Sequence, residues 1–256
     1  MRKLSFAAAA KIGFVLLLAQ GVAAEAAEVK IIAVPAISEL IGELGPQFER
    51  ETGHKLVIQY GVTGVTKQRI ETDEVFDLAI GPAPLMDDLI RQAKIASDTR
   101  TGIARVGHGV AVRAGAPKPD ISSADAFKRA LLNAKSVTYI AEGATGTLLA
   151  KVLDRLGIAE QMKAKTKLQR VADGIGQAVA TGEAELGFAT TNILVAVPGV
   201  ELAGLFPPEL QDYMVFTAGV GTAAAQPDTA KALIKHLTGP QAVAVIKAKG
   251  LERVTP

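Results

Sequence analysis

Short apolar runs alternate along the chain with segments in which apolar residues recur every three or four positions. Residues 29–34 form the first apolar run, and residues 37–48 carry apolar side chains at helical spacing before Gly53. Pro35 lies between them, where proline suits the first turn of a helix. Because strand–helix–strand repetition implies parallel pairing, the pattern predicts an α/β fold with mainly parallel sheets flanked by helices.

The alternation continues to residue 112 and resumes after a loop. Before the loop, the pattern predicts strands at 56–60, 76–80 and 103–112, with helices at 63–71 and 85–94. The loop spans residues 114–120 and is rich in proline, glycine and alanine. We therefore expect a second lobe to begin there.

The second half repeats the order of elements. Ser122 and Asp125 resemble a capping box for a helix that runs to Leu132. Strands are expected at 136–140, 168–171 and 186–190, helices at 145–156 and up to Thr181, then a returning strand at 213–220 and helices at 229–237 and 241–249. The predicted division is lobe I at 27–112 and 213–256, and lobe II at 113–212, with hinge strands between them.

Residues 1–26 have the pattern of a secretory signal peptide. Arg2 and Lys3 precede an apolar stretch that ends in small residues, and cleavage is expected after Ala24 or Ala26. The apolar stretch is short for a membrane span, and an uncleaved anchor helix is the alternative. We expect export to the bacterial periplasm.

The composition narrows the range of functions. The formal net charge is +2, from 28 Lys+Arg and 26 Asp+Glu, which is too little for nucleic-acid binding. The absence of cysteine excludes disulfides, thiolate metal sites and cysteine nucleophiles. His54, His108 and His236 lack metal-binding spacing, and we expect them on the surface or at helix ends. No metal or cofactor is predicted.

Three turns between a strand and a helix contain small or hydroxylated residues. They lie at 35–38, 61–64 and 142–146. The first backbone N–H groups of a helix lack partners within the helix and carry the positive end of its dipole, so such turns can bind anions. An ordinary capped turn is the alternative for each one alone, but in two facing lobes they suggest a ligand cleft.

Several segments in a fixed order resemble the periplasmic molybdate-binding protein family of ABC importers. They are residues 30–36, 48–55, 60–64, 76–80, 182–188 and 207–213, which together span nearly the whole mature chain. The resemblance implies a two-lobed type II periplasmic binding protein that closes on a small ligand. It also implies a tetrahedral dianion held by neutral hydroxyls and backbone N–H groups.

The resemblance also implies the positions of the ligand-binding residues. Ala36 and Val62 stand where the family has serine hydroxyls, and Thr190 stands where it has a tyrosine. Thr63 keeps the one hydroxyl of the second turn. The implied ligand-binding residues are Pro35, Ala36, Ser38, Val62, Thr63, Gly64, Thr145, Gly146, Ala172, Asp173, Thr190 and Thr191. Glu142 and Asp173 can approach the cleft, and if they line it the ligand is cationic or neutral.

The function that follows is the periplasmic solute-binding component of an ABC importer. Its expected ligand is a small oxyanion such as molybdate or tungstate, and its expected partner is a membrane permease. We expect a monomer that is not an enzyme, because no nucleophile or acid–base pair is visible. The alternatives are a different small ligand such as an organic acid, or a sensor or an enzyme on the same fold.

Overall fold

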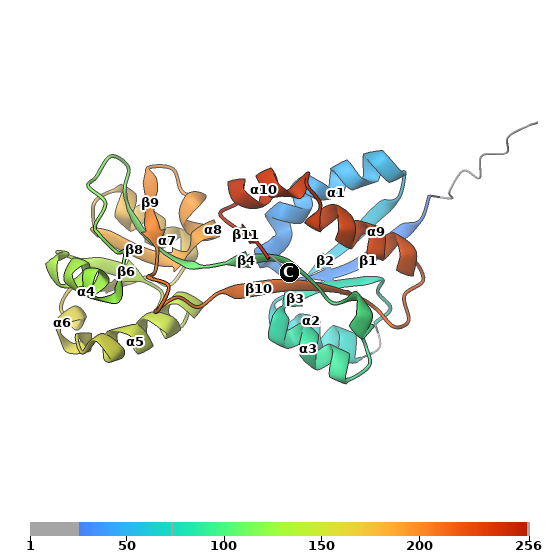
Figure 1. Ribbon diagram of the computed structural model, residues 1–256, viewed down its shortest axis with the longest axis horizontal. Coiled ribbons are helices and arrows are strands. Elements are labelled where there is room, and N and C mark those ends of the chain that lie inside the picture. The colour runs from blue at the N-terminus through green and yellow to red at the C-terminus, as the bar shows by residue number, and fades with distance from the viewer. Residues whose placement is uncertain (1–25, 73, 255–256) are drawn as a thin grey trace, which may run out of the picture.

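The computed structural model describes residues 26–72 and 74–254 and has two lobes joined by extended strands (Figure 1). The expected signal peptide, apart from Ala26, lies outside these residues. Within them, no helix has both the length and the apolar character that a membrane span requires. Each lobe has its own sheet and therefore its own hydrophobic core.

Lobe I is built on a six-stranded sheet with the order β11-β4-β10-β3-β1-β2. The strands β1, β2 and β3 pair in parallel, whereas β4, β10 and β11 pair antiparallel. The strands are β1 (Glu28–Ala33), β2 (Lys55–Tyr60), β3 (Leu78–Pro82), β4 (Thr101–Val106), β10 (Met214–Val220) and β11 (Glu252–Arg253). The helices are α1 (Ser38–Thr52), α2 (Thr63–Glu71), α3 (Ala83–Arg91), α9 (Pro227–Thr238) and α10 (Ala242–Ala248), with short 3-10 helices η1 (Pro35–Ile37) and η2 (Ser97–Thr99).

Lobe II is built on a five-stranded sheet with the order β7-β6-β8-β5-β9. Its strands are β5 (His108–Arg113), β6 (Val137–Tyr139), β7 (Thr166–Leu168), β8 (Leu186–Thr190) and β9 (Val200–Leu205). Its helices are α4 (Ala124–Asn133), α5 (Ala144–Leu156), α6 (Ala159–Lys163), α7 (Ala172–Ala180) and α8 (Thr191–Val195). β6 pairs in parallel with β7 and β8, and β5 pairs antiparallel with β8 and β9.

The two-lobed α/β fold is therefore confirmed, but both sheets are mixed rather than mainly parallel. The difference includes β10 in lobe I and β5 in lobe II, which run against the parallel strands of their sheets. β9 was not expected from the sequence. Its residues follow Pro198 and Gly199, which favour a loop, and tertiary pairing with β5 overrides that preference.

The expected strand at 103–112 is in fact two strands in different sheets. β4 ends at Val106, β5 begins at His108, and Gly107 alone separates them. A Cβ atom at Gly107 would lie 2.9 Å from a methyl carbon of Leu205 and 3.0 Å from the ring of Tyr213, so glycine lets the two crossing segments approach. The chain therefore changes sheet at Gly107, before the predicted lobe boundary at residue 112.

The amide side chain of Gln211 joins the two crossing segments. Its Oε1 accepts a hydrogen bond from the His108 N–H at 2.9 Å, and its Nε2 donates to the His108 carbonyl at 2.9 Å. This pair of bonds imitates one rung of an antiparallel sheet, just beyond the end of β9, where the ladder between β5 and β9 stops. Gln211 thus holds the outgoing and the returning chain together at the hinge.

A further contact links the lobes through α8. The Thr191 hydroxyl donates to the Gly250 carbonyl at 2.5 Å, and the Thr191 N–H donates to the Gly107 carbonyl at 3.0 Å. Gly250 has a φ of 68° and lies between α10 and β11, so a residue of lobe II bonds directly to lobe I.

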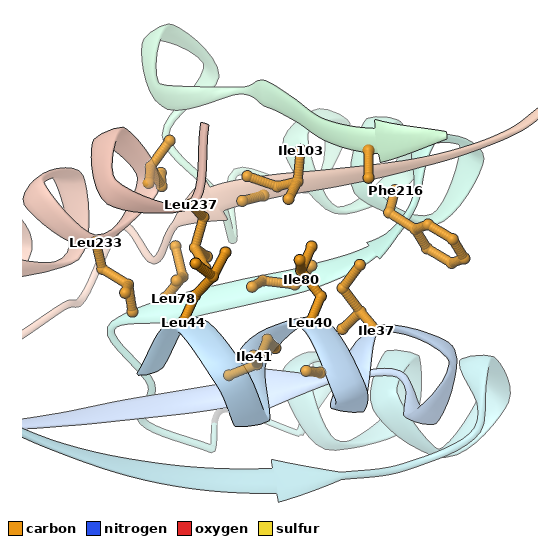
Figure 2. Packing of buried hydrophobic residues seen from close by; sticks show 14 of the residues in the cluster. Ile37, Leu40, Ile41, Leu44, Leu78, Ile80, Ile103, Phe216, Leu233 and Leu237 are labelled. Atoms are coloured by element: carbon orange, nitrogen blue, oxygen red, sulfur yellow. The ribbon is translucent and has the colours of Figure 1, made fainter. Parts of the chain in front are cut away.

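The core of lobe I forms between α1 and the sheet (Figure 2). Leu40, Ile41 and Leu44 project from one face of α1 onto Leu78 and Ile80 of β3, and all five are buried. Burying side chains of this size contributes about 1.5–3 kcal/mol each relative to leaving them exposed. The core of lobe II instead centres on aromatic rings: Phe127, Phe188 and Phe206 lie with centroids 5.1–6.2 Å apart.

The start of α4 corrects one predicted cap. The hydroxyl of Ser123, not Ser122, accepts the hydrogen bond from the Ala126 N–H at 3.2 Å. Ser122 instead donates its hydroxyl to Asp120 Oδ1 at 2.7 Å within the preceding loop. The pattern favoured Ser122 because Asp125 follows it three residues later, but the loop bond to Asp120 engages the Ser122 hydroxyl and Ser123 caps the helix.

Replacing Gln211 by alanine should weaken the hinge. The change leaves the His108 N–H without its partner, while the His108 carbonyl keeps only the bond that it accepts from the Phe206 N–H, and we expect a loss of about 1–3 kcal/mol in the free energy of unfolding. Urea denaturation measures it. Gln177→Ala is the matched control, because Gln177 is exposed on α7 and its side chain forms no hydrogen bond in the described chain. Equal losses in the two variants would show that the Gln211 bonds contribute nothing.

Candidate ligand-binding cleft

The gap between the lobes contains two neighbouring cavities, which we call the first chamber and the side chamber. The first chamber has a volume of about 420 Å³ and the side chamber about 500 Å³. Ala144 and Met214 line both, so the N-terminus of α5 and the start of β10 separate them. Parallel strands of both lobes end at this gap, which is where α/β sheets usually bind ligands.

Among the described residues, the first chamber has mostly apolar walls and no ionisable side chain. Its lining is Pro35, Ala36, Val106, Ile140, Gly143, Ala144, Thr145, Ile175, Phe188, Ala189, Thr190, Asn192, Ile193, Met214 and Phe216. The side-chain polar groups are limited to two hydroxyls and one amide. Of these, the Thr190 hydroxyl forms no hydrogen bond in the described chain, and the Asn192 Oδ1 is buried without a partner. The chamber can therefore hold a ligand with a large apolar part.

Hydrogen-bond donors gather at the N-terminus of α5. The helix has Gly143 at its N-cap without a side-chain cap, and its first internal bond is donated by Thr147 to the Gly143 carbonyl. The N–H groups of Ala144, Thr145 and Gly146 are therefore left without partners in the described chain. Together with the helix dipole they favour an anionic group at this end of the chamber.

Gly146 lets the first turn of α5 lie close to the preceding segment. A Cβ atom there would overlap the carbonyl oxygens of Ile140 and Ala141. Thr145 is also buried, with 7% of its surface exposed, so this turn packs tightly against lobe II. The donor geometry at the chamber is thus fixed by packing.

The side chamber lies along one face of α5. Ala144, Thr147, Leu148 and Lys151 recur at the spacing of a single helix face and form one wall. The opposite side consists of Pro82, Ala83, Pro84, His108, Asp212, Tyr213, Met214 and Val215. This chamber contains the ionisable groups that the first one lacks.

His108 is buried at the hinge rather than on the surface or at a helix end, as its lack of a metal-binding pattern had suggested. It is 4% exposed, and its Nδ1 lies 2.7 Å from the hydroxyl oxygen of Thr145. Burial lowers the pKa of the His108 imidazole, and the negative charge of Asp212 partly offsets this effect. The ring is therefore neutral near pH 7 and bonds the hinge to the first turn of α5.

Four of the sequence-predicted site residues line the first chamber: Pro35, Ala36, Thr145 and Thr190. Gly146 and Thr191 lie beside it, with the Thr191 hydroxyl engaged by Gly250. Ser38, Val62, Thr63, Gly64, Ala172 and Asp173 line neither chamber, and Val62 is 64% exposed at the start of α2. Their assignment to the ligand site stays a prediction, as does that of the first four.

Sequence reasoning missed His108, Lys151, Asn192 and Met214. A glycine on each side of His108 was the available signal, because paired glycines mark a place where other chain segments approach closely. Lys151 and Asn192 follow helix starts at unremarkable spacings. Glu142 and Asp173, which were expected to approach the cleft, are exposed and line neither chamber. No group of three or more His, Asp or Glu in residues 26–72 and 74–254 could hold a metal ion.

Comparison with known proteins identifies the family. A family model described as bacterial extracellular solute-binding protein matches residues 29–252. The chain belongs to this family. The aconitate isomerase of a Pseudomonas species is 34% identical over 230 residues, covering 88% of this chain and 87% of that protein. The molybdate-binding protein ModA of Azotobacter vinelandii is 32% identical over 243 residues, covering 89% and 91%.

Solved structures confirm the fold of this solute-binding protein. A substrate-binding domain from Clostridium difficile has a TM-score of 0.81 at 19% identity, covering 90% of this chain and 100% of that one. The periplasmic molybdate-binding protein of Azotobacter vinelandii has a TM-score of 0.62 at 22% identity, covering 89% and 99%. The expected two-lobed periplasmic binding protein fold is therefore confirmed.

Acid should destabilise this solute-binding protein partly through His108. The folded chain favours the neutral ring, whereas the unfolded chain takes up a proton near pH 6.5, so stability falls as the pH drops below that value. We expect the parent to lose more unfolding free energy between pH 7.5 and 5.0 than His108→Gln, measured by urea denaturation.

The parent and His108→Gln share the groups that face residue 108, so the contribution of these groups to the pH dependence cancels when the two are compared. These groups are Thr145, Phe206, Gln211, Asp212 and, across the side chamber, Lys151. Identical pH dependence in parent and variant would mean that the ring titrates alike in the folded and unfolded states.

Proposed function

We propose that this solute-binding protein serves an ABC importer in the periplasm and that its first chamber binds a small organic carboxylate. The observation that carries the proposal is the combination of apolar walls with a cluster of unpartnered N–H donors at the start of α5. A carboxylate can accept from these donors while the carbon skeleton of the ligand contacts the walls.

An inorganic tetrahedral oxyanion suits this chamber less well. Such a dianion exposes oxygens on all sides, and burying it without enough donors is costly. Ala36 lies on the wall where the molybdate-binding family has a serine, and Ile140, Phe188 and Phe216 offer no donor from their side chains. The organic acid, which was the alternative from sequence alone, is therefore the better candidate.

The relatives support both ligands to a similar degree. The relative named aconitate isomerase acts on a tricarboxylic acid, and the relative named ModA binds molybdate, at 34% and 32% identity. Molybdate therefore stays the second candidate, and the shape and polarity of the first chamber favour the carboxylate.

We further propose that binding occurs without chemical turnover. No ionisable side chain of the described residues lines the first chamber, so these residues offer no general acid or base for chemistry on the part of a ligand held there. Because the chain is 34% identical to an aconitate isomerase, the absence of turnover is tested directly below.

A ligand screen separates the two candidates. Thermal unfolding is followed with cis-aconitate, trans-aconitate, succinate, molybdate, tungstate and sulfate. A ligand present at about 100 times its Kd stabilises the folded state by about 2.7 kcal/mol, so we expect the carboxylates to raise the Tm by about 5–11 °C. NMR of the aconitate samples should show an unchanged isomer ratio. A Tm increase with molybdate alone would reject the carboxylate, and interconversion of the isomers would reject binding without turnover.

Replacing Thr190 by valine tests the location of the site. Its hydroxyl lines the first chamber and bonds to nothing in the described chain, so stability should be unchanged. Losing one hydrogen bond to a charged ligand should weaken affinity by about tenfold to a hundredfold, measured by calorimetry.

Two further variants complete this comparison. Thr229→Val on α9 of lobe I is the matched control and should bind like the parent. Thr63→Val examines the second turn, which lies outside both chambers: lost affinity there would mean that lobe closure brings α2 to the ligand. Normal binding by Thr190→Val would remove the first chamber as the site.

A further inference from the structure

The two chambers differ in charge, and this difference points to a larger ligand than the first chamber alone suggests. The first chamber offers donors but no positive side chain, so a ligand with two or three carboxylates would leave charges uncompensated there. The side chamber, which shares Ala144 and Met214 with it, is lined by the cation Lys151.

Lys151 has no competing partner. It is exposed on α5 and forms no hydrogen bond or ion pair within the described residues. The nearby cation Arg105 is not comparable, because its guanidinium bonds to Glu252 at 2.7 Å and lies 4.1 Å above the ring of Tyr213. Lys151 is thus the cation of the side chamber that is available to a ligand.

The position of Lys151 relates it to the N-terminus of α5. Both lie on the same helix, and at 1.5 Å per residue Lys151 is about 10 Å along the axis from Ala144. A long flexible lysine side chain can span part of that distance toward the helix start. One short-chain ligand can therefore reach the donors of the first chamber and the ammonium group of the side chamber together.

The other ionisable groups of the side chamber define its polarity. Asp212 lies just before β10, on the wall of the side chamber opposite α5, and its negative charge repels a carboxylate toward Lys151. His108 is neutral, and its Nε2 forms no hydrogen bond in the described chain, so it can donate or accept without adding charge. A carboxylate in the side chamber is thus attracted to the wall formed by α5, where Lys151 lies.

We propose that the side chamber is a second compartment of the ligand site and that Lys151 binds a further carboxylate of a short-chain di- or tricarboxylate. This inference rests on the proposed function, because it assumes that the first carboxylate lies at the start of α5. It makes Lys151 the residue that distinguishes polycarboxylates from monocarboxylates.

Calorimetry with three probes tests this inference: butyrate, glutarate and propane-1,2,3-tricarboxylate. In Lys151→Gln we expect the affinity for the last two to fall by about tenfold, with butyrate affected less than twofold. Lys231→Gln is the control, because Lys231 is exposed on α9 and outside both chambers. Unchanged Tm values without ligand will show that the variants fold.

The possible outcomes separate this inference from the proposed function. If the tricarboxylate binds the parent and Lys151→Gln equally well, the second compartment is wrong while the carboxylate site stands. If all three probes lose affinity equally in Lys151→Gln, the lysine does not discriminate and the inference is also wrong. If no carboxylate binds the parent, the proposed function fails and this inference with it. Loss of binding in Asp212→Asn alone would instead indicate a cationic group in the side chamber.

Discussion

The arrangement of the whole molecule depends on how two chain crossings are held beside each other. In the described residues, lobe I and lobe II are joined covalently at Gly107 and through residues 206–213. Just beyond the end of β9, where its ladder with β5 stops, the side chain of Gln211 supplies a pair of hydrogen bonds to the backbone of His108. Because His108 receives those bonds and its ring contacts Thr145, the same small group of residues also positions the start of α5.

This link between hinge and cleft explains why the candidate site has so few polar side chains. The donors at the start of α5 are backbone N–H groups, whose direction is set by the helix and by the close packing of Gly146. Backbone donors of this kind need no side-chain ordering when a ligand arrives, so less conformational entropy is lost on binding. The apolar walls can then select the shape of the ligand, while charge selection is left to the side chamber.

The periodic parts of the chain were predictable from sequence, and the lobe crossings were not. The helix at 63–71 is α2, and the one at 145–156 differs from α5 by one residue, because apolar spacing and a following Gly157 mark it clearly. The crossing at Gly107 lies inside a continuous apolar run, where nothing local reports that the sheet changes. Similarly, the neutral His108 depends on burial by Phe206 and the returning chain, which are remote in sequence. Pro35, Ala36 and Thr145 could be associated with the cleft because each follows a strand, and Thr190 could be associated with it through the family resemblance. Lys151 could not be assigned from sequence, because it lines a cavity only when the start of β10 lies opposite α5.

The strand order of lobe I also sets the order in which the molecule can assemble. β10 lies between β3 and β4, so β4 has no neighbour in its sheet until residue 214 and beyond have been synthesised. Lobe II, in contrast, uses the continuous segment from β5 to β9 and can fold as a unit earlier in the chain. The pairing of β4 with β10 therefore closes a loop of more than one hundred residues, and this loop contains the whole of lobe II. Pairing residues so far apart in sequence raises the contact order and slows this step. β10 and the segment before it complete both the hinge and the wall of the side chamber opposite α5, so a ligand-competent cleft forms only after this late step.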